Sequence, residues 1–108
     1  INANNSYINI LNDDVVVQIG SSSLFHNVRI DCSHGIGQQC KIGRGLTVHG
    51  MKIKLCEHCV CIIGEDCMFS NSINIWATDG HSVLDKNTRQ ILNHADTPLI
   101  IGNHVWVG

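Results

Sequence analysis

His81 is the residue with the clearest capacity for chemistry in this chain of 108 residues, which contains seven histidines. It follows the turn-forming pair Asp79-Gly80 and precedes Ser82. Imidazole changes its charge between about pH 5 and 8, so a histidine presented by a turn can exchange a proton with a bound molecule near neutral pH. We therefore take His81 as the leading candidate for acid-base chemistry.

The remaining histidines are scattered along the chain, and positions at the surface or at corners explain them more simply than catalysis does. His94 is the rival to His81, because it lies in the same segment of the sequence. The others are His26, His34, His49, His58 and His104.

Six cysteines raise the question of a metal site, because they include the run Cys-Glu-His-Cys-Val-Cys. Structural zinc sites use two separated ligand pairs with short spacing, and only Cys56 and Cys59 form such a pair. Cys40, Cys61 and Cys67 fall at positions that the repeat described next turns inward, where a thiol acts as a small apolar group. We expect thiols that fill the core, without metal and without disulfides.

A six-residue repeat determines the expected fold. Its period matches neither an isolated strand nor a helix, so a short strand and a corner must recur together. A repeat of this length is the mark of a parallel β-helix, here an all-β prism. The branched apolar residues that define it are Leu24, Ile30, Ile36, Ile42 and Val48.

A second apolar column precedes the first by two residues, and both columns are expected to face inward because residues two apart in a strand share a side. Glycine often follows the first column and suits a sharp corner. Members of the second column are Val28, Cys40, Leu46, Cys61, Cys67, Ile73, Leu99 and Val105.

The repeat is interrupted between Ile75 and Leu99, so residues 77–98 must leave the prism as a long protruding loop. Loops of this length in compact folds are more often functional than connective. We expect residues 1–108 to form a single domain. Because the repeat resumes only shortly before Gly108, we expect further coils to follow, which makes the chain a fragment truncated at its C-terminal end.

Composition excludes several classes of partner. The net charge is −2 and no basic cluster appears in the sequence, which argues against nucleic acid and against an anionic membrane surface. No apolar run approaches the ~18 residues of a membrane span, and the first residues lack the pattern of a signal peptide. We expect a soluble, cytoplasmic protein.

Two blocks of sequence carry a resemblance to a known family. They are "IGEDCMFSNSINIWATDGHSV" and "TPLIIGNHVWVG", which flank the loop. In them the chain resembles the left-handed β-helix, hexapeptide-repeat acyltransferases, especially the sugar O-acetyltransferases of the galactoside and maltose acetyltransferase kind. The resemblance implies a prism of three flat parallel sheets with left-handed crossovers, and His81 as the catalytic general base.

The resemblance further implies the reaction and the assembly. Acetyl-CoA is the expected acyl donor, and a homotrimer with active sites between subunits is the expected assembly. His81 would take the proton of an acceptor hydroxyl, whose oxygen then attacks the thioester. The expected function is therefore acetyl-CoA-dependent O-acetylation of a sugar or polysaccharide precursor. The identity of the acceptor, and the choice between O- and N-acylation, stay open.

Three further residues are candidates for substrate binding. Trp106 is expected to wall the acyl or pantetheine channel, with plain packing as the alternative. Asn71 can contact the acceptor or serve a turn. Asp79, or a backbone carbonyl, can orient the ring of His81.

Two other functions remain as alternatives. A metalloenzyme of the γ-carbonic anhydrase type needs histidines stacked on neighbouring coils around zinc. With about 18 residues in a coil of three six-residue repeats, no histidine pair has that separation. The other alternative is a catalytically silent scaffold, against which the Gly-His-Ser sequence in a long loop speaks.

Overall fold

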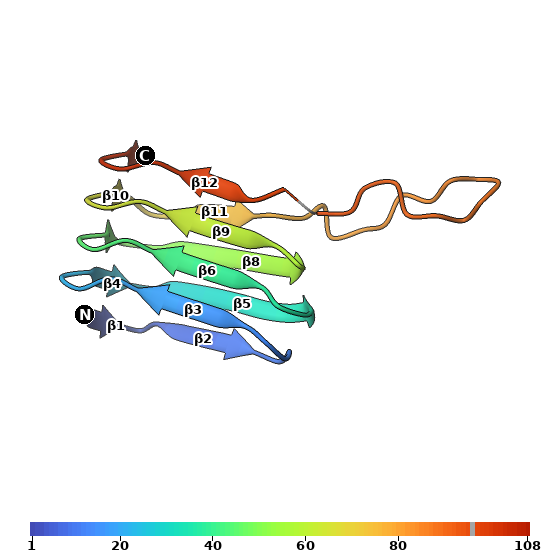
Figure 1. Cartoon of the computed structure of the whole chain (residues 1–108). Coiled ribbons are helices and arrows are strands. Elements are labelled where there is room, and N and C mark those ends of the chain that lie inside the picture. Colours follow the sequence, from blue (N-terminus) through green and yellow to red (C-terminus); the bar gives the residue numbers. More distant parts are fainter. Residues whose placement is uncertain (96) are drawn as a thin grey trace.

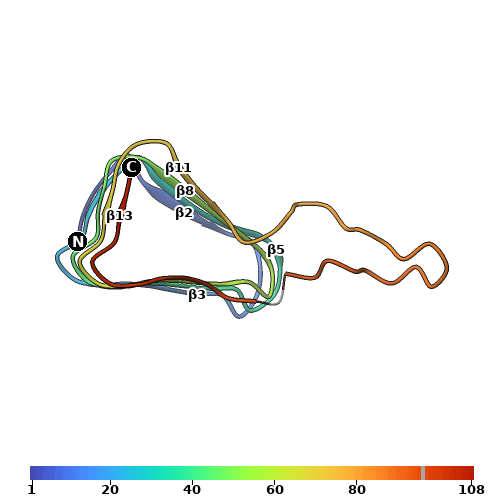
Figure 2. The same cartoon turned by 90° about the horizontal axis from the view of Figure 1, so that it is seen from above.

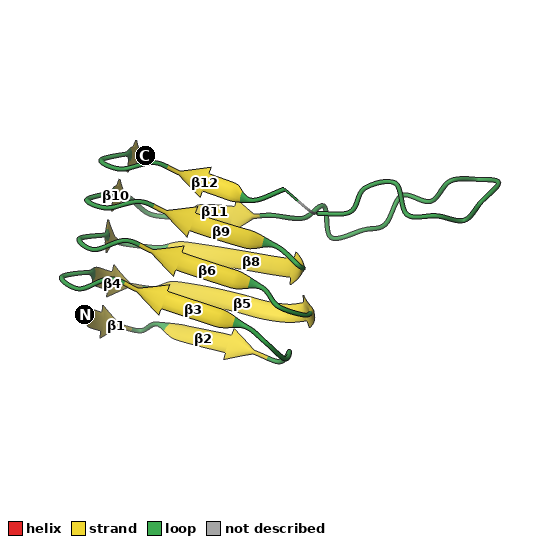
Figure 3. Ribbon diagram, in the orientation of Figure 1, coloured by secondary structure: helices red, strands yellow, loops and turns green. Residues whose placement is uncertain are grey.

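The computed structural model describes residues 1–95 and 97–108, and the described residues form strands and loops without a helix. The strands make three sheets in which all neighbouring strands are parallel (Figures 1 and 3). The chain visits the three sheets in turn, and the view along the axis is triangular (Figure 2). The expected all-β, parallel β-helix is confirmed.

Each sheet takes every third strand of the stack. The first sheet contains β1 (Asn2–Asn4), β4 (Leu24–His26), β7 (Thr47–Val48), β10 (Met68–Phe69) and β13 (Trp106–Val107). The second contains β2 (Tyr7–Ile10), β5 (Val28–Gly35), β8 (Met51–Glu57) and β11 (Ile73–Trp76). The third contains β3 (Val16–Ile19), β6 (Gln39–Ile42), β9 (Val60–Ile63) and β12 (Leu99–Ile101).

The coils are longer than three six-residue repeats. Leu24 pairs with Thr47 on the next coil, and Thr47 pairs in turn with Met68. The expected coil length was therefore wrong, because extra residues sit at the corners. One consequence concerns histidines: His26 and His49 directly follow the paired residues Phe25 and Val48, so these two histidines do lie in register on adjacent coils.

The core is a single apolar stack inside the prism. Most of the inward positions expected from the repeat are buried, including Ile30, Ile42, Val48 and Ile63. At the ends of the stack the same columns are only partly buried, as at Ile19 and Val107. Burial of this apolar surface in successive layers is the main force that holds the coils together.

Two expected inward residues, Leu24 and Ile36, are instead exposed. In the strand of Leu24 it is Phe25 that is buried. Phe25 follows the inward residue Ile19 by six positions, and the spacing then slips by one, because Ile30 follows Phe25 by only five. Ile36 lies in a corner that follows the irregular end of β5, where the register shifts between Asp31 and His34. The six-residue spacing of these two residues is therefore accidental.

Two of the corners are built from columns of residues with left-handed backbone. Between the first and second sheets Asn27 and Ser72 have φ of 53° and 60°. Between the third and first sheets Gly45 and Asp66 have φ of 77° and 60°. Glycine and short polar residues adopt this conformation most easily, and its repetition in successive coils keeps the corners in register.

The third corner, between the second and third sheets, is wide, and the long loop leaves the prism there (Figures 1 and 2). We call residues 77–98 the arm; residue 96 lies outside the described part of the chain. The two legs of the arm run antiparallel, with a bridge between Leu84 and Ile91 and a hydrogen bond from the Leu92 N–H to the Val83 carbonyl. At the tip the Asp85 carboxylate accepts hydrogen bonds from two backbone N–H groups, and they lower its pKa.

Candidate functional site

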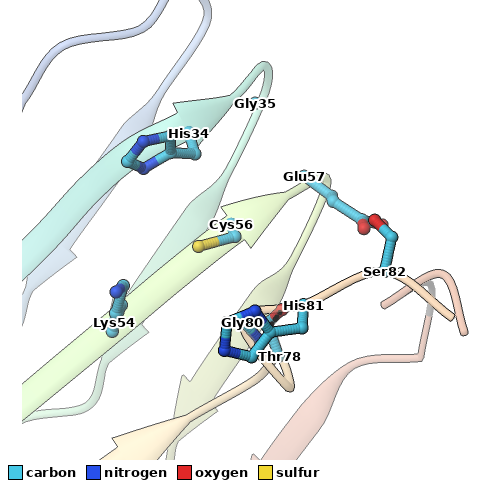
Figure 4. A pocket seen from close by; sticks show the side chains of 9 residues that line it. All are labelled: His34, Gly35, Lys54, Cys56, Glu57, Thr78, Gly80, His81 and Ser82. Atoms are coloured by element: carbon cyan, nitrogen blue, oxygen red, sulfur yellow. Dashed lines mark hydrogen bonds between the residues drawn. The ribbon is translucent and has the colours of Figure 1, made fainter.

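A pocket of about 350 Å³ lies where the arm leaves the prism. Three segments from three successive coils form it: the end of β5, the end of β8 and the outgoing leg of the arm (Figure 4). The lining residues are His34, Gly35, Lys54, Cys56, Glu57, Thr78, Gly80, His81 and Ser82. His81 therefore lies outside the prism, in a pocket with basic, acidic and thiol side chains.

The backbone around His81 is shaped by local hydrogen bonds and by glycine. Gly80 has φ of +76°, which glycine adopts without strain, and its N–H donates to Thr78 Oγ1 at 3.1 Å. The sharp turn that results carries the exposed imidazole of His81 on the side of the arm where Lys54 and Cys56 lie (Figure 4).

Asn93 connects the two legs of the arm at His81. Its Nδ2 donates to the His81 carbonyl at 2.8 Å and to Asp79 Oδ2 at 3.0 Å. Its Oδ1 accepts from the Val83 N–H at 2.6 Å. One side chain thus bonds the Asp79 carboxylate and the backbone of His81 and Val83, a role that the sequence does not signal because a loop asparagine carries no distinguishing local pattern.

Glu57 fixes the returning leg of the arm to the prism. Its Oε2 accepts from the Ala95 N–H at 2.9 Å and lies 3.3 Å from His94 Nδ1. His94, the rival candidate in the sequence, therefore pairs with a carboxylate at the base of the arm. The contact explains His94 as an anchor of the loop.

The cysteine pair that suggested zinc is divided between two environments. Cys59 is buried, and its Sγ lies 3.2 Å from the Ala77 carbonyl and 3.7 Å from the Ala95 carbonyl, between the two legs of the arm. Cys56 is half-buried and lines the pocket. All six cysteines are free, and among the described residues no three His, Cys, Asp or Glu side chains are grouped to hold a metal ion.

The thiols inside the prism pack as apolar groups. Cys40, Cys61 and Cys67 are buried, as the repeat predicted, and so is Cys32. Burial raises the pKa of Cys32 to about 11 and raises that of Cys56 above its ordinary value. Thiols whose pKa is raised stay largely protonated near neutral pH.

The other candidate residues lie apart from the pocket of His81. Asp79 faces the other side of the arm, where its carboxylate accepts from Asn93. Asn71 lies in a hollow at the corner between β10 and β11, and Trp106 lies on β13 with 76% of its surface exposed. β13 belongs to the first sheet, on the far side of the prism from the arm (Figure 2). Within one chain, His81 is separated from Asn71 and Trp106.

Two apolar surfaces remain uncovered. Val83, Leu84 and Leu92 are exposed on the arm, each with about half or more of its surface accessible. On the outer face of the first sheet, Met68 pairs directly with Trp106, and both are exposed. In the described part of the chain, no helix has the length and apolar character needed to cross a membrane.

Comparison with known proteins gives a curated relative and a solved structure of the same kind. The polysialic acid O-acetyltransferase of Escherichia coli O1:K1 / APEC is 34% identical over 73 residues, which are 68% of this chain and 22% of the relative. The crystal structure of the polysialic acid O-acetyltransferase OatWY superimposes with a TM-score of 0.59 at 23% identity, covering 99% of this chain and 66% of that one. No family model matches the chain.

The chain therefore spans about a fifth of the length of the curated relative. Its three parallel sheets correspond to the parallel β-helix that the repeat predicted and to the left-handed form that the resemblance implied. Over the matched residues the chain is similar in sequence to the O-acetyltransferase of Escherichia coli, and over its length it shares the fold of the solved one.

Proposed function

We propose that the protein is an acetyl-CoA-dependent O-acetyltransferase that acetylates a hydroxyl group of a saccharide, with His81 as the general base. The observation that carries this proposal is the position of His81, which Asn93 holds at the exit of the arm, exposed and beside a pocket. The sequence similarity to a relative named as an O-acetyltransferase, together with the shared fold, supports the reaction class.

The chemistry requires one proton acceptor and two aligned substrates. The imidazole of His81 takes the proton of the acceptor hydroxyl while the oxygen attacks the thioester carbonyl of acetyl-CoA. A backbone N–H stabilises the tetrahedral oxyanion. The C–S bond then breaks, the CoA sulfur takes the proton from the imidazolium, and the acetyl ester leaves; no covalent intermediate on the enzyme is needed.

A homotrimer completes the site in this proposal. His81 is remote from Asn71 and Trp106 within one chain, while the arm and the first sheet both expose apolar side chains. We place the arm of one subunit against the first sheet of its neighbour, so that His81 faces Trp106 of another copy across the interface. Apolar burial of this kind is typical of obligate homo-oligomers.

The six unpaired cysteines support a reducing, cytoplasmic location for the reaction. The acceptor is a sugar or polysaccharide hydroxyl.

Replacing the proposed base tests the function. In the whole protein we expect His81→Ala to reduce kcat by about 10² to 10⁴ with little change in KM, as for loss of a general base. The measurement is release of CoA thiol with a panel of saccharide acceptors. His94→Ala is the matched control, because it also removes an imidazole from the arm, and its kcat should stay far above that of His81→Ala. Turnover by His81→Ala close to that of the wild type would remove this residue from the role.

A further inference from the structure

We propose that the outer face of the second sheet binds the acceptor as an acidic polysaccharide, whose carboxylates are held by Arg29, Lys52 and Lys54. This inference rests on the proposed function and names the class of its acceptor. We call these three cations, with the aromatic residues Tyr7 and Trp76, the basic face.

The register of the second sheet gathers the basic face from distant parts of the sequence. The outward side chains of neighbouring strands form two rows that cross the sheet. One row is Tyr7, Arg29, Lys52 and Asn74, and the next is Asn9, Asp31, Lys54 and Trp76.

The charge of these rows is opposite to that of the chain as a whole. They contain three of the seven Lys and Arg residues of a chain whose net charge is −2. Asp31 is the acid within them; it is buried and pairs with Arg29 at 3.1 Å, so it presents little negative charge to solvent. Lys52 and Lys54 are half-buried, and neither forms an ion pair with the described residues.

Aromatic rings flank the cations, with Tyr7 on β2 and Trp76 on β11. Lys52 Nζ is 5.9 Å and Lys54 Nζ is 5.1 Å from the centroid of the Trp76 ring, and the Arg29 guanidinium is 5.3 Å from that of Tyr7. These contacts hold the cations in place beside exposed rings. Trp76 and Tyr7 are about half exposed, and an exposed aromatic ring offers an apolar surface to a sugar ring. Cations flanked by exposed rings match a polymer that carries a carboxylate on each pyranose.

The basic face is continuous with the candidate site. Lys54 belongs to the basic face and also lines the pocket of His81. At the other ends of the strands, at the corner between the first and second sheets, Arg29 and Lys52 line the hollow that contains Asn71. A polysaccharide lying across the sheet would therefore reach from this hollow to His81. The relative is named for polysialic acid, an acidic sugar polymer, which agrees with this charge.

Binding, measured without catalysis, tests the proposal in the whole protein. We expect calorimetry with polysialic acid fragments and no acetyl-CoA to show binding that weakens as salt rises from about 20 to 200 mM, because the contacts are ionic and exposed. Lys52→Gln/Lys54→Gln should weaken binding about tenfold. The control is Lys41→Gln/Lys86→Gln, which removes the same charge from the third sheet and from the tip of the arm and should leave binding within about twofold.

Three results would overturn the inference: an equal loss in the control double variant, equally tight binding of neutral dextran, or equally tight binding of a single-stranded oligonucleotide of matched charge. His81→Ala separates this inference from the proposed function, because that variant should keep polysaccharide binding whether or not it transfers acetyl groups. Polysaccharide binding by a wild-type protein that transfers no acetyl group, or full activity in His81→Ala, would contradict the proposed function and leave the basic face in place.

Discussion

Asn93 is the residue through which the arm controls the position of His81. Its side chain bonds the carbonyl of His81, the carboxylate of Asp79 and the N–H of Val83, so it ties the outgoing leg to the returning leg. The sequence offered Asp79 or a backbone carbonyl to orient the imidazole; in the structure the Asp79 carboxylate accepts a hydrogen bond from Asn93. We therefore assign Asn93 a positioning role.

Loss of this side chain should lower kcat and change KM little. For Asn93→Ala in the whole protein we expect a fall in kcat of roughly tenfold or more, since three hydrogen bonds of about 1 kcal/mol each hold the turn. Steady-state kinetics separate the two constants. Asn87→Ala is the control, because Asn87 lies at the tip of the arm, and wild-type kinetics are expected for it. A rise in KM without a fall in kcat would contradict the positioning role.

Reactivity of the thiols should follow their burial. Cys56 is half-buried in the pocket, whereas the other five cysteines are buried. We expect a maleimide to modify Cys56 first, as read by mass spectrometry. Because burial raises the pKa of Cys56, its thiolate is scarce near pH 7, and the labelling rate should climb as the pH rises through 9.

Replacement of Cys56 provides the control for this experiment. Cys56→Ser should abolish the fast labelling and leave only slow modification of the buried thiols. Modification of Cys40 or Cys61 in the folded protein at the rate of Cys56 would show that the stack opens more easily than its packing implies.

At the scale of the elements, the stacking of coils at the wide corner depends on Gly35. It ends β5 with φ of +126°, and a Cβ atom there would collide with the carbonyl oxygen of Glu57 in the next coil. Glu57 in turn anchors the arm. The close approach of two backbones thus connects the stability of the prism with the geometry of the candidate site.

Gly35→Ala should therefore destabilise the protein by about 2 kcal/mol or more, since both the positive φ and the collision oppose it. Gly37→Ala isolates the two effects, because Gly37 has φ of +72° but no atom within 4 Å of its Cβ position. We expect a loss of about 1 kcal/mol for Gly37→Ala from backbone strain alone. Chemical denaturation measures the free energy of unfolding of both variants. Equal losses of stability would show that the collision with Glu57 adds nothing to the cost of the positive φ.

For the whole molecule, the separation of His81 from Trp106 leads to a test by complementation. If each site takes His81 from one subunit and Trp106 from its neighbour, mixing two inactive proteins should restore activity. In the proposed trimer, His81→Ala and Trp106→Ala subunits that are dissociated together and reassembled should regain about one quarter of wild-type sites. The measurement is acetyl transfer after reassembly.

Each variant reassembled alone controls for refolding and should stay inactive. No recovery in a mixture that has exchanged subunits, as shown by native mass spectrometry, would place a complete site within one subunit or assign Trp106 to packing.

The sequence predicted the fold well because the strand itself imposes the pattern. Side chains two apart face one way, so paired apolar columns such as Cys40 with Ile42, or Cys61 with Ile63, reveal an inward face without knowledge of any neighbour. Where the spacing slipped, the same reasoning selected Leu24 over Phe25, because a one-residue shift reverses which side chains point inward. The local Asp-Gly-His-Ser sequence likewise indicated His81 as the candidate for acid-base chemistry.

The sequence did not predict which residues of neighbouring coils lie side by side, because alternation along one strand says nothing about the next coil. These neighbours depend on the length of each coil. Each coil is longer than three six-residue repeats because the left-handed corners and the wide corner contain extra residues. The sequence contains no basic cluster, yet pairing of β5 with β8 sets Arg29 beside Lys52 and forms a basic face. The hydrogen bonds of Asn93 could not be predicted either, because they join the two legs of the arm. The sequence by itself determined which side chains turn inward, since alternation along a strand is local; only the tertiary structure decided which outward side chains meet, since that depends on the register between coils.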